Sequence, residues 1–316
     1  MSAQRRATWP LGRPRTSGYL GRQRRTGILL VLPALVVMLA VLAYPIVSSI
    51  VLSLQRVQPG GGKFSGTWVG LDNYFNIGSD PAFGTALGNS VYFTAIEVVA
   101  VVVLGLAVAT LLNHPLGRSA FFRVILLIPW ALSPVANAVI WKWIYNANYG
   151  ILNYLLHQLG IINQYVVWLG DPHLALNSLL VADIWKSIPF IALLLLAGLQ
   201  NVPPILYRAA RLDGASAWQT FRFVTLPQLR TTILICVVLQ SIWALKVFDL
   251  IYVLTKGGPA DGTVLLNFLS YRETFDFGDF GYGAALADIL FLMMFVLALI
   301  YLRTFRPTSG ARQVDA

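Results

Sequence analysis

Seven ionisable residues lie inside strongly apolar stretches of the sequence. A charge within a membrane is costly unless it pairs with another group or faces water, so each of them marks a structural contact or a polar path. Two pairs have i, i+3 spacing, which predicts local ion pairs between Asp183 and Lys186 and between Lys246 and Asp249. Lys142 suits an interfacial position from which its ammonium group reaches water. The full set is Glu97, Lys142, Asp183, Lys186, Lys246, Asp249 and Asp288.

The same residues suit two other functions. They can form the polar wall of a cavity, or their carboxylates can relay protons in an ion-coupled secondary transporter. A catalytic or metal site has less support, because the three histidines fall in separate connecting segments and the single Cys236 lies in an apolar run. We therefore expect no enzyme activity in this chain, and no bound metal or cofactor.

The composition explains why these charges are exceptional. The 316 residues are 57% hydrophobic and 11% charged, whereas roughly 25% of the residues of a soluble domain are charged. Six apolar segments are long enough to span a bilayer, and several contain prolines that should kink them. These segments cover about 27–54, 88–112, 120–145, 176–199, 231–254 and 282–302.

Basic residues predict which side of the membrane each segment faces. Residues 1–26 carry seven arginines and no acid, a polybasic arm that the positive-inside rule places in the cytoplasm. Most of the 23 lysines and arginines fall on this same side, which includes the tail at 305–316. The sequence thus predicts an uncleaved first span, with both termini cytoplasmic, in the cell (inner, cytoplasmic) membrane. The net charge of +10 reflects this topology and not nucleic-acid binding.

Two loops have helical patterns of their own. Residues 149–160 repeat leucine and isoleucine at helical intervals, which predicts a short amphipathic helix on the outer surface. The cytoplasmic loop at 203–227 reads as helix, turn and helix, with prolines suited to a first helical turn. Asp213-Gly214 supplies the turn, and Ser216 with the glutamine three residues later forms a capping box. Small residues beside four arginines suit this hairpin for close docking of another protein.

The hairpin resembles the EAA loop, E-A-A-x3-G-x9-I-x-L-P, of permease subunits in ATP-binding-cassette importers. The spacing from Ala209 to Pro227 is the same, but Arg208 stands at the glutamate position and Val224 at the isoleucine position. The resemblance implies that this loop couples the permease to its ATPase. The residues at the matching positions are Arg208, Ala209, Ala210, Asp213, Gly214, Ala215, Leu226 and Pro227.

Shorter stretches extend the resemblance to the carbohydrate branch, and in particular to maltose- and trehalose-type sugar permeases. They are Ala43-Tyr44-Pro45, Gly70-Leu71-Asp72-Asn73-Tyr74, Trp185-Lys186-x-x-Pro189-Phe190 and Leu254-Thr255-x-Gly257-Gly258-Pro259. The resemblance implies an all-α integral membrane domain at 27–304 with six transmembrane helices. It also implies import of a sugar or oligosaccharide by alternating access, or import of a different polar solute such as a glycerol phosphate diester.

The implied partners are a second, different permease subunit, two ATP-binding subunits on the cytoplasmic side and an extracytoplasmic substrate-binding protein. No P-loop motif occurs in the sequence, so we expect ATP hydrolysis in the separate subunits. Sugars present apolar faces to aromatic rings and hydroxyls to amides and carboxylates. The candidates for the substrate path are Asn137, Trp141, Trp185, Gln240 and Trp243. Interfacial anchoring is the alternative for Trp141 and Trp143, and the paired permease can carry most of the site.

Overall fold

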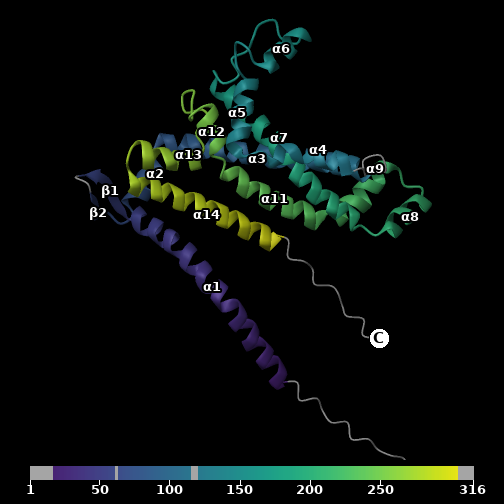
Figure 1. The fold of residues 1–316 in the computed structure, drawn as a ribbon, viewed down its shortest axis with the longest axis horizontal. Coiled ribbons are helices and arrows are strands. Elements are labelled where there is room, and N and C mark those ends of the chain that lie inside the picture. Colours follow the sequence, from purple (N-terminus) through teal and green to yellow (C-terminus); the bar gives the residue numbers. More distant parts are fainter. Residues whose placement is uncertain (1–16, 61–62, 115–119, 305–316) are drawn as a thin grey trace, which may run out of the picture. The chain divides into compact units, whose positions relative to one another are not determined.

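The computed structural model describes residues 17–60, 63–114 and 120–304, and most of them are helical (Figure 1). Most of the predicted N-terminal arm and the whole of the tail at 305–316 lie outside these residues. The chain divides into two units, Met1–Val51 and Leu52–Ala316, which we describe separately. The first unit contains most of helix α1 (Ser17–Ser53), a single helix whose stretch Leu29–Ser53 is long and apolar enough to cross a membrane.

The second unit begins with an element that the all-α prediction did not include. It is an antiparallel hairpin of strands β1 (Gln55–Gly60) and β2 (Lys63–Trp68), in which Gln55 faces Trp68. The remaining α-helices are α2 (Asp72–Ser79), α3 (Pro81–Asn113), α4 (Ala120–Ala131), α5 (Pro134–Ile144), α6 (Ile151–Gln158), α7 (Pro172–Gln200), α8 (Pro204–Leu212), α9 (Ala217–Thr220), α10 (Leu226–Gln228), α11 (Arg230–Leu245), α12 (Asp249–Leu254), α13 (Leu266–Tyr271) and α14 (Phe280–Thr304). Two short π-helical segments, Phe221–Thr225 and Arg272–Asp276, follow α9 and α13.

The predicted third span is broken in its middle. Helices α4 and α5 meet at an angle of 90° across Leu132 and Ser133. Pro134 explains the break, because a proline lacks a backbone donor and disfavours a helical conformation in the residue before it. The hydroxyl of Ser133 then caps α5 by accepting the Ala136 N–H at 3.2 Å. The predicted span at 120–145 is therefore two helices.

The predicted fifth span is also wrong in its extent. Helix α11 ends at Leu245, three residues follow, and α12 begins at Asp249. At its other end, α11 meets the segment Ala217–Gln228 at 67°. Within the described residues, four helices are long and apolar enough to span a membrane, and six spans result if each bent pair counts as one.

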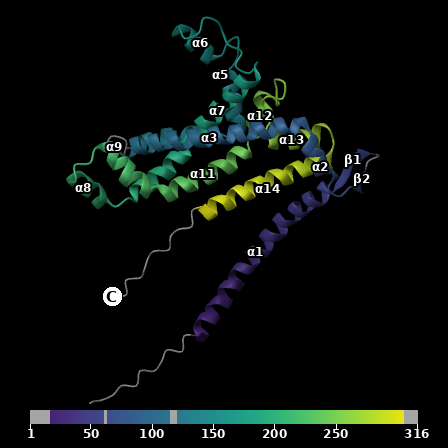
Figure 2. The same cartoon turned by 180° about the vertical axis from the view of Figure 1, so that it is seen from behind.

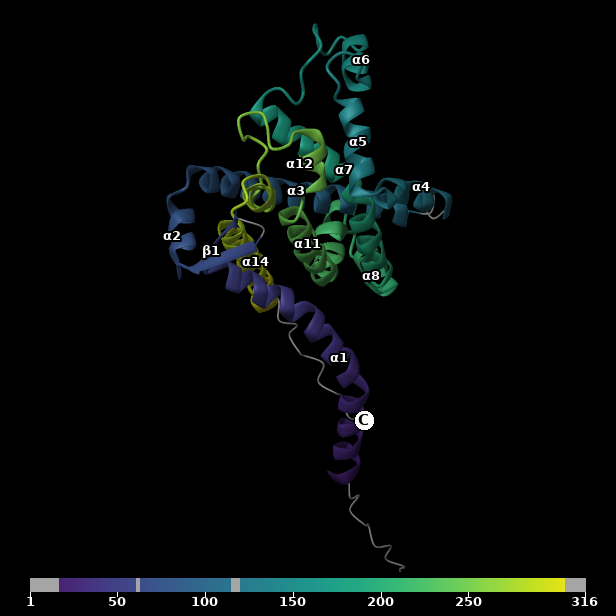
Figure 3. The ribbon, with the colours of Figure 1, turned by 60° about the vertical axis from the view of Figure 1, so that its left-hand side comes forward.

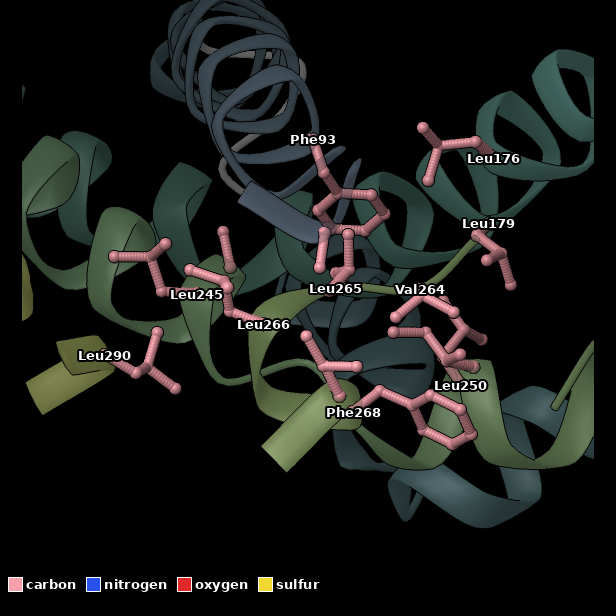
Figure 4. Close-up of a cluster of buried hydrophobic side chains, with 14 of the residues drawn as sticks. Phe93, Leu176, Leu179, Leu245, Leu250, Val264, Leu265, Leu266, Phe268 and Leu290 are labelled. Carbon is pink, nitrogen blue, oxygen red and sulfur yellow. The ribbon is translucent and has the colours of Figure 1, made fainter. Parts of the chain in front are cut away.

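Helices α3 and α7 form the most extensive helix pair, and α11 packs against both (Figure 2). Helix α5 packs against α12, and both contact α7 (Figure 3). One apolar cluster joins α3, α7, α12, α13 and α14 around Phe93, Leu179 and Leu265 (Figure 4). A second cluster joins α3 to α7 and α11. Helices α3 and α7 therefore pack against each other and against the helices of the broken spans.

Polar side chains on the helices fix the connecting segments. Asn89 of α3 donates to the carbonyls of Gly262 and Val264 at 3.2 and 3.1 Å, and the Ser90 hydroxyl accepts the Leu266 N–H at 2.8 Å.

The predicted helix at 149–160 is present as α6. Asn153 of α6 is fully buried, and both the oxygen and the nitrogen of its side-chain amide form hydrogen bonds to one loop. Its oxygen accepts from the Val166 N–H and the Trp168 indole, and its nitrogen donates to the carbonyls of Ala147 and Val166.

The close contact between α7 and α11 depends on Gly198. A Cβ atom at this position would lie 2.8 Å from Thr232 Oγ1 and 2.9 Å from Leu229 Cδ2. Gly88 on α3 is a matched control, because it is exposed and a Cβ there meets nothing within 4 Å.

We predict that Gly198→Ala lowers the thermal unfolding midpoint of the purified protein in detergent, since overpacking costs about 1–3 kcal/mol. Gly88→Ala should leave the midpoint unchanged or raise it, because alanine is favoured over glycine in a helix by roughly 1 kcal/mol. Equal shifts in the two variants would show that the α7–α11 contact is not tight at Gly198.

Candidate functional site

A cleft of about 280 Å³ lies where the two broken spans meet α7. The α4–α5 break forms one wall of the cleft, and the α11–α12 break forms a second wall. One face of α7 forms the third wall. The cleft is lined by Trp130, Pro134, Asn137, Asp183, Lys186, Ser187, Trp243, Lys246, Val247, Phe248, Asp249 and Leu250. Six residues that the sequence singled out separately, as substrate-path candidates or as membrane charges, are thus brought together.

Asn137 has an unusual position in this cleft. It is only 1% exposed, and its amide nitrogen reaches the Ala182 carbonyl at 3.5 Å. Its oxygen Oδ1 has no hydrogen-bond partner among the described residues. A buried amide oxygen without a partner costs about 1–3 kcal/mol, so this atom is available to accept a hydrogen bond from a bound molecule.

The charged residues of the cleft are not paired as the sequence predicted. Neither Lys186 with Asp183 nor Lys246 with Asp249 forms an ion pair; within the described residues a direct ion pair joins Arg272 and Asp261, at 2.6 Å. Lys246 and Asp249 fail to pair along one helix because α11 ends before Lys246. The two lysines and two aspartates therefore line the cleft without neutralising each other directly.

Three aromatic rings from three helices form one side of the cleft region. Trp130 of α4 stacks on Phe190 of α7 with ring centroids 5.2 Å apart. Phe190 in turn contacts Trp243 of α11, also at 5.2 Å. Trp130 and Trp243 line the cleft and are partly exposed to it. Such a surface suits the apolar face of a sugar ring.

The other substrate-path candidates lie outside this lining. Trp141 and Trp185 contact each other edge to face, with centroids 5.8 Å apart. Gln240 is fully buried and donates a hydrogen bond to the Glu97 carboxyl. These three residues form contacts between helices.

Besides Glu97, two membrane charges predicted from the sequence lie outside the cleft lining. Lys142 donates to the Val253 carbonyl at 3.2 Å, which ties α5 to the end of α12. Asp288 accepts a hydrogen bond of 3.1 Å from the Tyr74 hydroxyl of α2. Burial, together with the neighbouring Asp288 charge, raises the pKa of the Tyr74 phenol, so this hydroxyl stays a donor at neutral pH.

The hairpin at 203–227 has the predicted turn and cap. Helix α8 ends in a Schellman motif, in which the Ala215 N–H bonds to the Ala210 carbonyl and the Gly214 N–H to the Arg211 carbonyl. Gly214 has φ of +72°, a conformation that side chains with a Cβ rarely adopt. Both hydrogen bonds of the capping box between Ser216 and the following Gln219 are present.

The surface of this hairpin is both apolar and basic. Leu212 is 89% exposed at the turn, and Trp218 and Phe223 are exposed on the second arm. Arg208, the residue at the glutamate position of the EAA pattern, is exposed on α8. Tyr207 and Thr225 join the two arms through their hydroxyls at 3.3 Å. The two arms of the hairpin are therefore joined to each other. Their apolar side chains Leu212, Trp218 and Phe223 stay exposed within the described residues.

Residues 101–306 match the sequence profile of a family described as "Binding-protein-dependent transport system inner membrane component". The chain belongs to this family. It is a permease component, and the assignment favours a binding-protein-dependent transporter over the ion-coupled secondary transporter considered from the charges.

Individual relatives resemble the permease over almost its whole length. The trehalose/maltose transport system permease protein of Thermococcus litoralis is 37% identical over 291 residues, covering 92% of this chain and 97% of the relative. The lactose transport system permease protein of Rhizobium radiobacter is 34% identical over 278 residues, covering 87% and 92%. A solved bacterial alginate ABC transporter, in complex with a periplasmic protein, has the same fold, with a TM-score of 0.77 at 20% identity over 92% of this chain and 97% of that one.

Sequence reasoning missed half of the permease's cleft. Trp130, Ser187 and Phe248 line it but were not among the candidates. The Ser133-Pro134 dipeptide, a typical turn signal, was available to indicate the break beside Trp130. Phe248 carried no comparable signal, because no proline or glycine stands at the end of α11.

The cleft and the buried positions behind it should differ in their access to water. We predict that Ser187→Cys reacts with a charged methanethiosulfonate reagent, whereas the native Cys236, which is fully buried on α11, does not. Gln240→Cys, one turn from Cys236, should be equally protected. Mass spectrometry of the intact permease measures the label, and protection of the cysteine at 187 would show that the cleft is closed to water.

Proposed function

We propose that this permease is the translocation subunit of an ATP-driven importer for a sugar or oligosaccharide, and that the cleft contacts the solute during passage. The observation that carries the proposal is the meeting of the α4–α5 break and the α11–α12 break around Asn137 and Trp243. Non-helical backbone at membrane depth is tolerated where it lines a cavity. Discontinuous helices of this kind form the solute sites of many transporters.

The chemistry of the cleft favours an uncharged polyhydroxylated solute. Two lysines supply donors, two aspartates and the free Asn137 oxygen supply acceptors, and the positive and negative side chains are equal in number. Trp243 adds an aromatic face. A glycerol phosphate diester would bring a negative charge to a site that has no excess of positive charge, so we favour a neutral sugar. Relatives named for trehalose, maltose and lactose transport agree with this choice.

The complete importer requires other chains in this proposal. A second permease supplies the opposite half of the path, two ATP-binding subunits dock at the hairpin in the cytoplasm, and an extracytoplasmic binding protein delivers the solute. The exposed Leu212, Trp218 and Phe223 provide the apolar part of the ATPase contact, and Arg208 provides a charge. Both termini then face the cytoplasm.

ATP binding drives alternating access in this scheme. Closure of the two ATPase subunits moves the hairpins, and the hinge at Leu229, where the second arm meets α11 at 67°, transmits this motion to the cleft wall that contains Trp243. The cleft then opens outward to the loaded binding protein. Hydrolysis returns it to the inward-facing state.

We predict that Trp243→Ala reduces uptake at least tenfold when the complex is reconstituted with its partners and supplied with radiolabelled maltose, trehalose or lactose. The loss corresponds to one aromatic contact of about 1.4 kcal/mol. Trp143→Ala is the control, since Trp143 is 66% exposed outside the cleft. Unlabelled neutral disaccharide should compete and glycerophosphocholine should not. Normal uptake by Trp243→Ala would remove the cleft from the solute path.

The coupling role of the hairpin is tested at Gly214. Gly214→Val should leave membrane insertion intact but abolish uptake and co-purification of the ATPase, because the Schellman motif requires positive φ and valine resists it by roughly 1 kcal/mol or more. Gly214→Asn should be much milder, since asparagine tolerates this conformation. Arg208→Glu, which introduces the usual family residue, should also be mild. Normal transport by the valine variant would show that the hairpin is not the coupling element.

A further inference from the structure

Behind the cleft, Glu97 of α3 and Asp183 of α7 bring two carboxyl groups into contact. Glu97 is fully buried, and its carboxyl lies within hydrogen-bonding reach of Asp183. The Glu97 oxygen Oε1 accepts a hydrogen bond from the Gln240 amide of α11, whereas Oε2 is buried and accepts no hydrogen bond from a donor among the described residues. Three helices therefore converge on one buried carboxyl, and the α7 residue of this contact, Asp183, lines the cleft.

A hydrogen bond between two carboxyl groups requires a proton on one of them. Two carboxylates in contact repel each other, and burial further disfavours the doubly ionised state. The amide of Gln240 supplies a donor to Glu97 but no charge. Lys186, on the cleft side, is the cationic group that acts on Asp183. One proton shared between Glu97 and Asp183 accounts for the arrangement.

This contact also explains why Asp183 does not pair with Lys186, although both lie on α7 at i, i+3 spacing. The carboxyl of Asp183 is held against α3 by Glu97, so Lys186 stays free in the cleft wall. If the tie to α3 were lost, Asp183 would be free to bond to Lys186. Both groups would then be withdrawn from a bound solute.

We propose that Glu97 and Gln240 are positioning residues for the cleft: they hold the Asp183 carboxyl in the cleft wall through a shared proton, and so keep Asp183 and Lys186 apart and available to the hydroxyl groups of the solute. The inference rests on the proposed function of the cleft for its effect on uptake. The shared proton itself is independent of any solute.

Infrared spectroscopy of the reconstituted complex at neutral pH tests the proton directly. The native complex should show the carbonyl stretch of a buried, protonated carboxyl, and this band should be absent from Glu97→Gln and from Asp183→Asn. Thr94→Val is the matched control, because Thr94 lies one turn away on α3 and its hydroxyl has no hydrogen-bond partner among the described residues; it should keep the band. A band that survives in both carboxyl variants would overturn the shared proton.

Uptake of radiolabelled maltose, trehalose or lactose tests the positioning role. Glu97→Gln can still donate to Asp183 and accept from Gln240, so its KM should stay near the native value. Glu97→Ala should raise KM roughly tenfold, the effect of one lost hydrogen bond to a charged group. Equal KM values for the two variants, at native abundance in the membrane, would contradict the proposal.

The two proposals fail in different ways. If Trp243→Ala transports normally, the cleft is not the solute path, but the infrared band still reports the shared proton. If Trp243→Ala is defective and both Glu97 variants keep the native KM, the cleft function holds and the positioning role is wrong. Should Glu97→Ala not reach the membrane, Gln240→Leu, which removes the donor to Glu97, is expected to raise KM in its place; a native KM in that variant would contradict the positioning role.

Discussion

Peptide groups in the hydrocarbon region of a bilayer have no water to bond to, and this constraint decides where a membrane-spanning helix can break. In this permease the α4–α5 and α11–α12 breaks border the same cleft. Polar side chains that would be costly against lipid, such as Asn137 and Lys246, lie at these breaks. The breaks and the cleft therefore depend on each other, since the irregular backbone needs a polar surrounding and the polar wall needs interrupted helices.

Helix α7 makes this arrangement possible, because it stays continuous through Pro189 and packs along the length of α3. It forms a continuous wall of the cleft, opposite the two walls that the broken spans form. The buried contact between Glu97 and Asp183 joins this wall to α3, while Gly198 allows α11 to approach at the other end. The α3–α7 pair is therefore the most extensively packed pair of helices in the second unit.

Features encoded over a few residues were predictable from the sequence. The turn at Gly214, the capping box at Ser216 and the long apolar helices each have a local physical cause. The failures are non-local. A hydropathy window averages across Leu245, so the end of α11 was missed and an ion pair between Lys246 and Asp249 was expected on a helix that does not exist. Asp183 and Lys186 do share a helix, but the tertiary contact with Glu97 outcompetes their local pairing.

The amide of Asn153 closes the loop that follows α5 upon itself, and every polar atom of this side chain is used within residues 147–168. The segment between α5 and α7 thus satisfies the Asn153 amide internally, and Trp168 joins it to the helices on either side, through its ring to Tyr145 and through its carbonyl to the Ser178 hydroxyl. Because this segment carries its own hydrogen-bonded frame, substitutions at its exposed positions can change the surface of the permease without altering the helices that line the cleft.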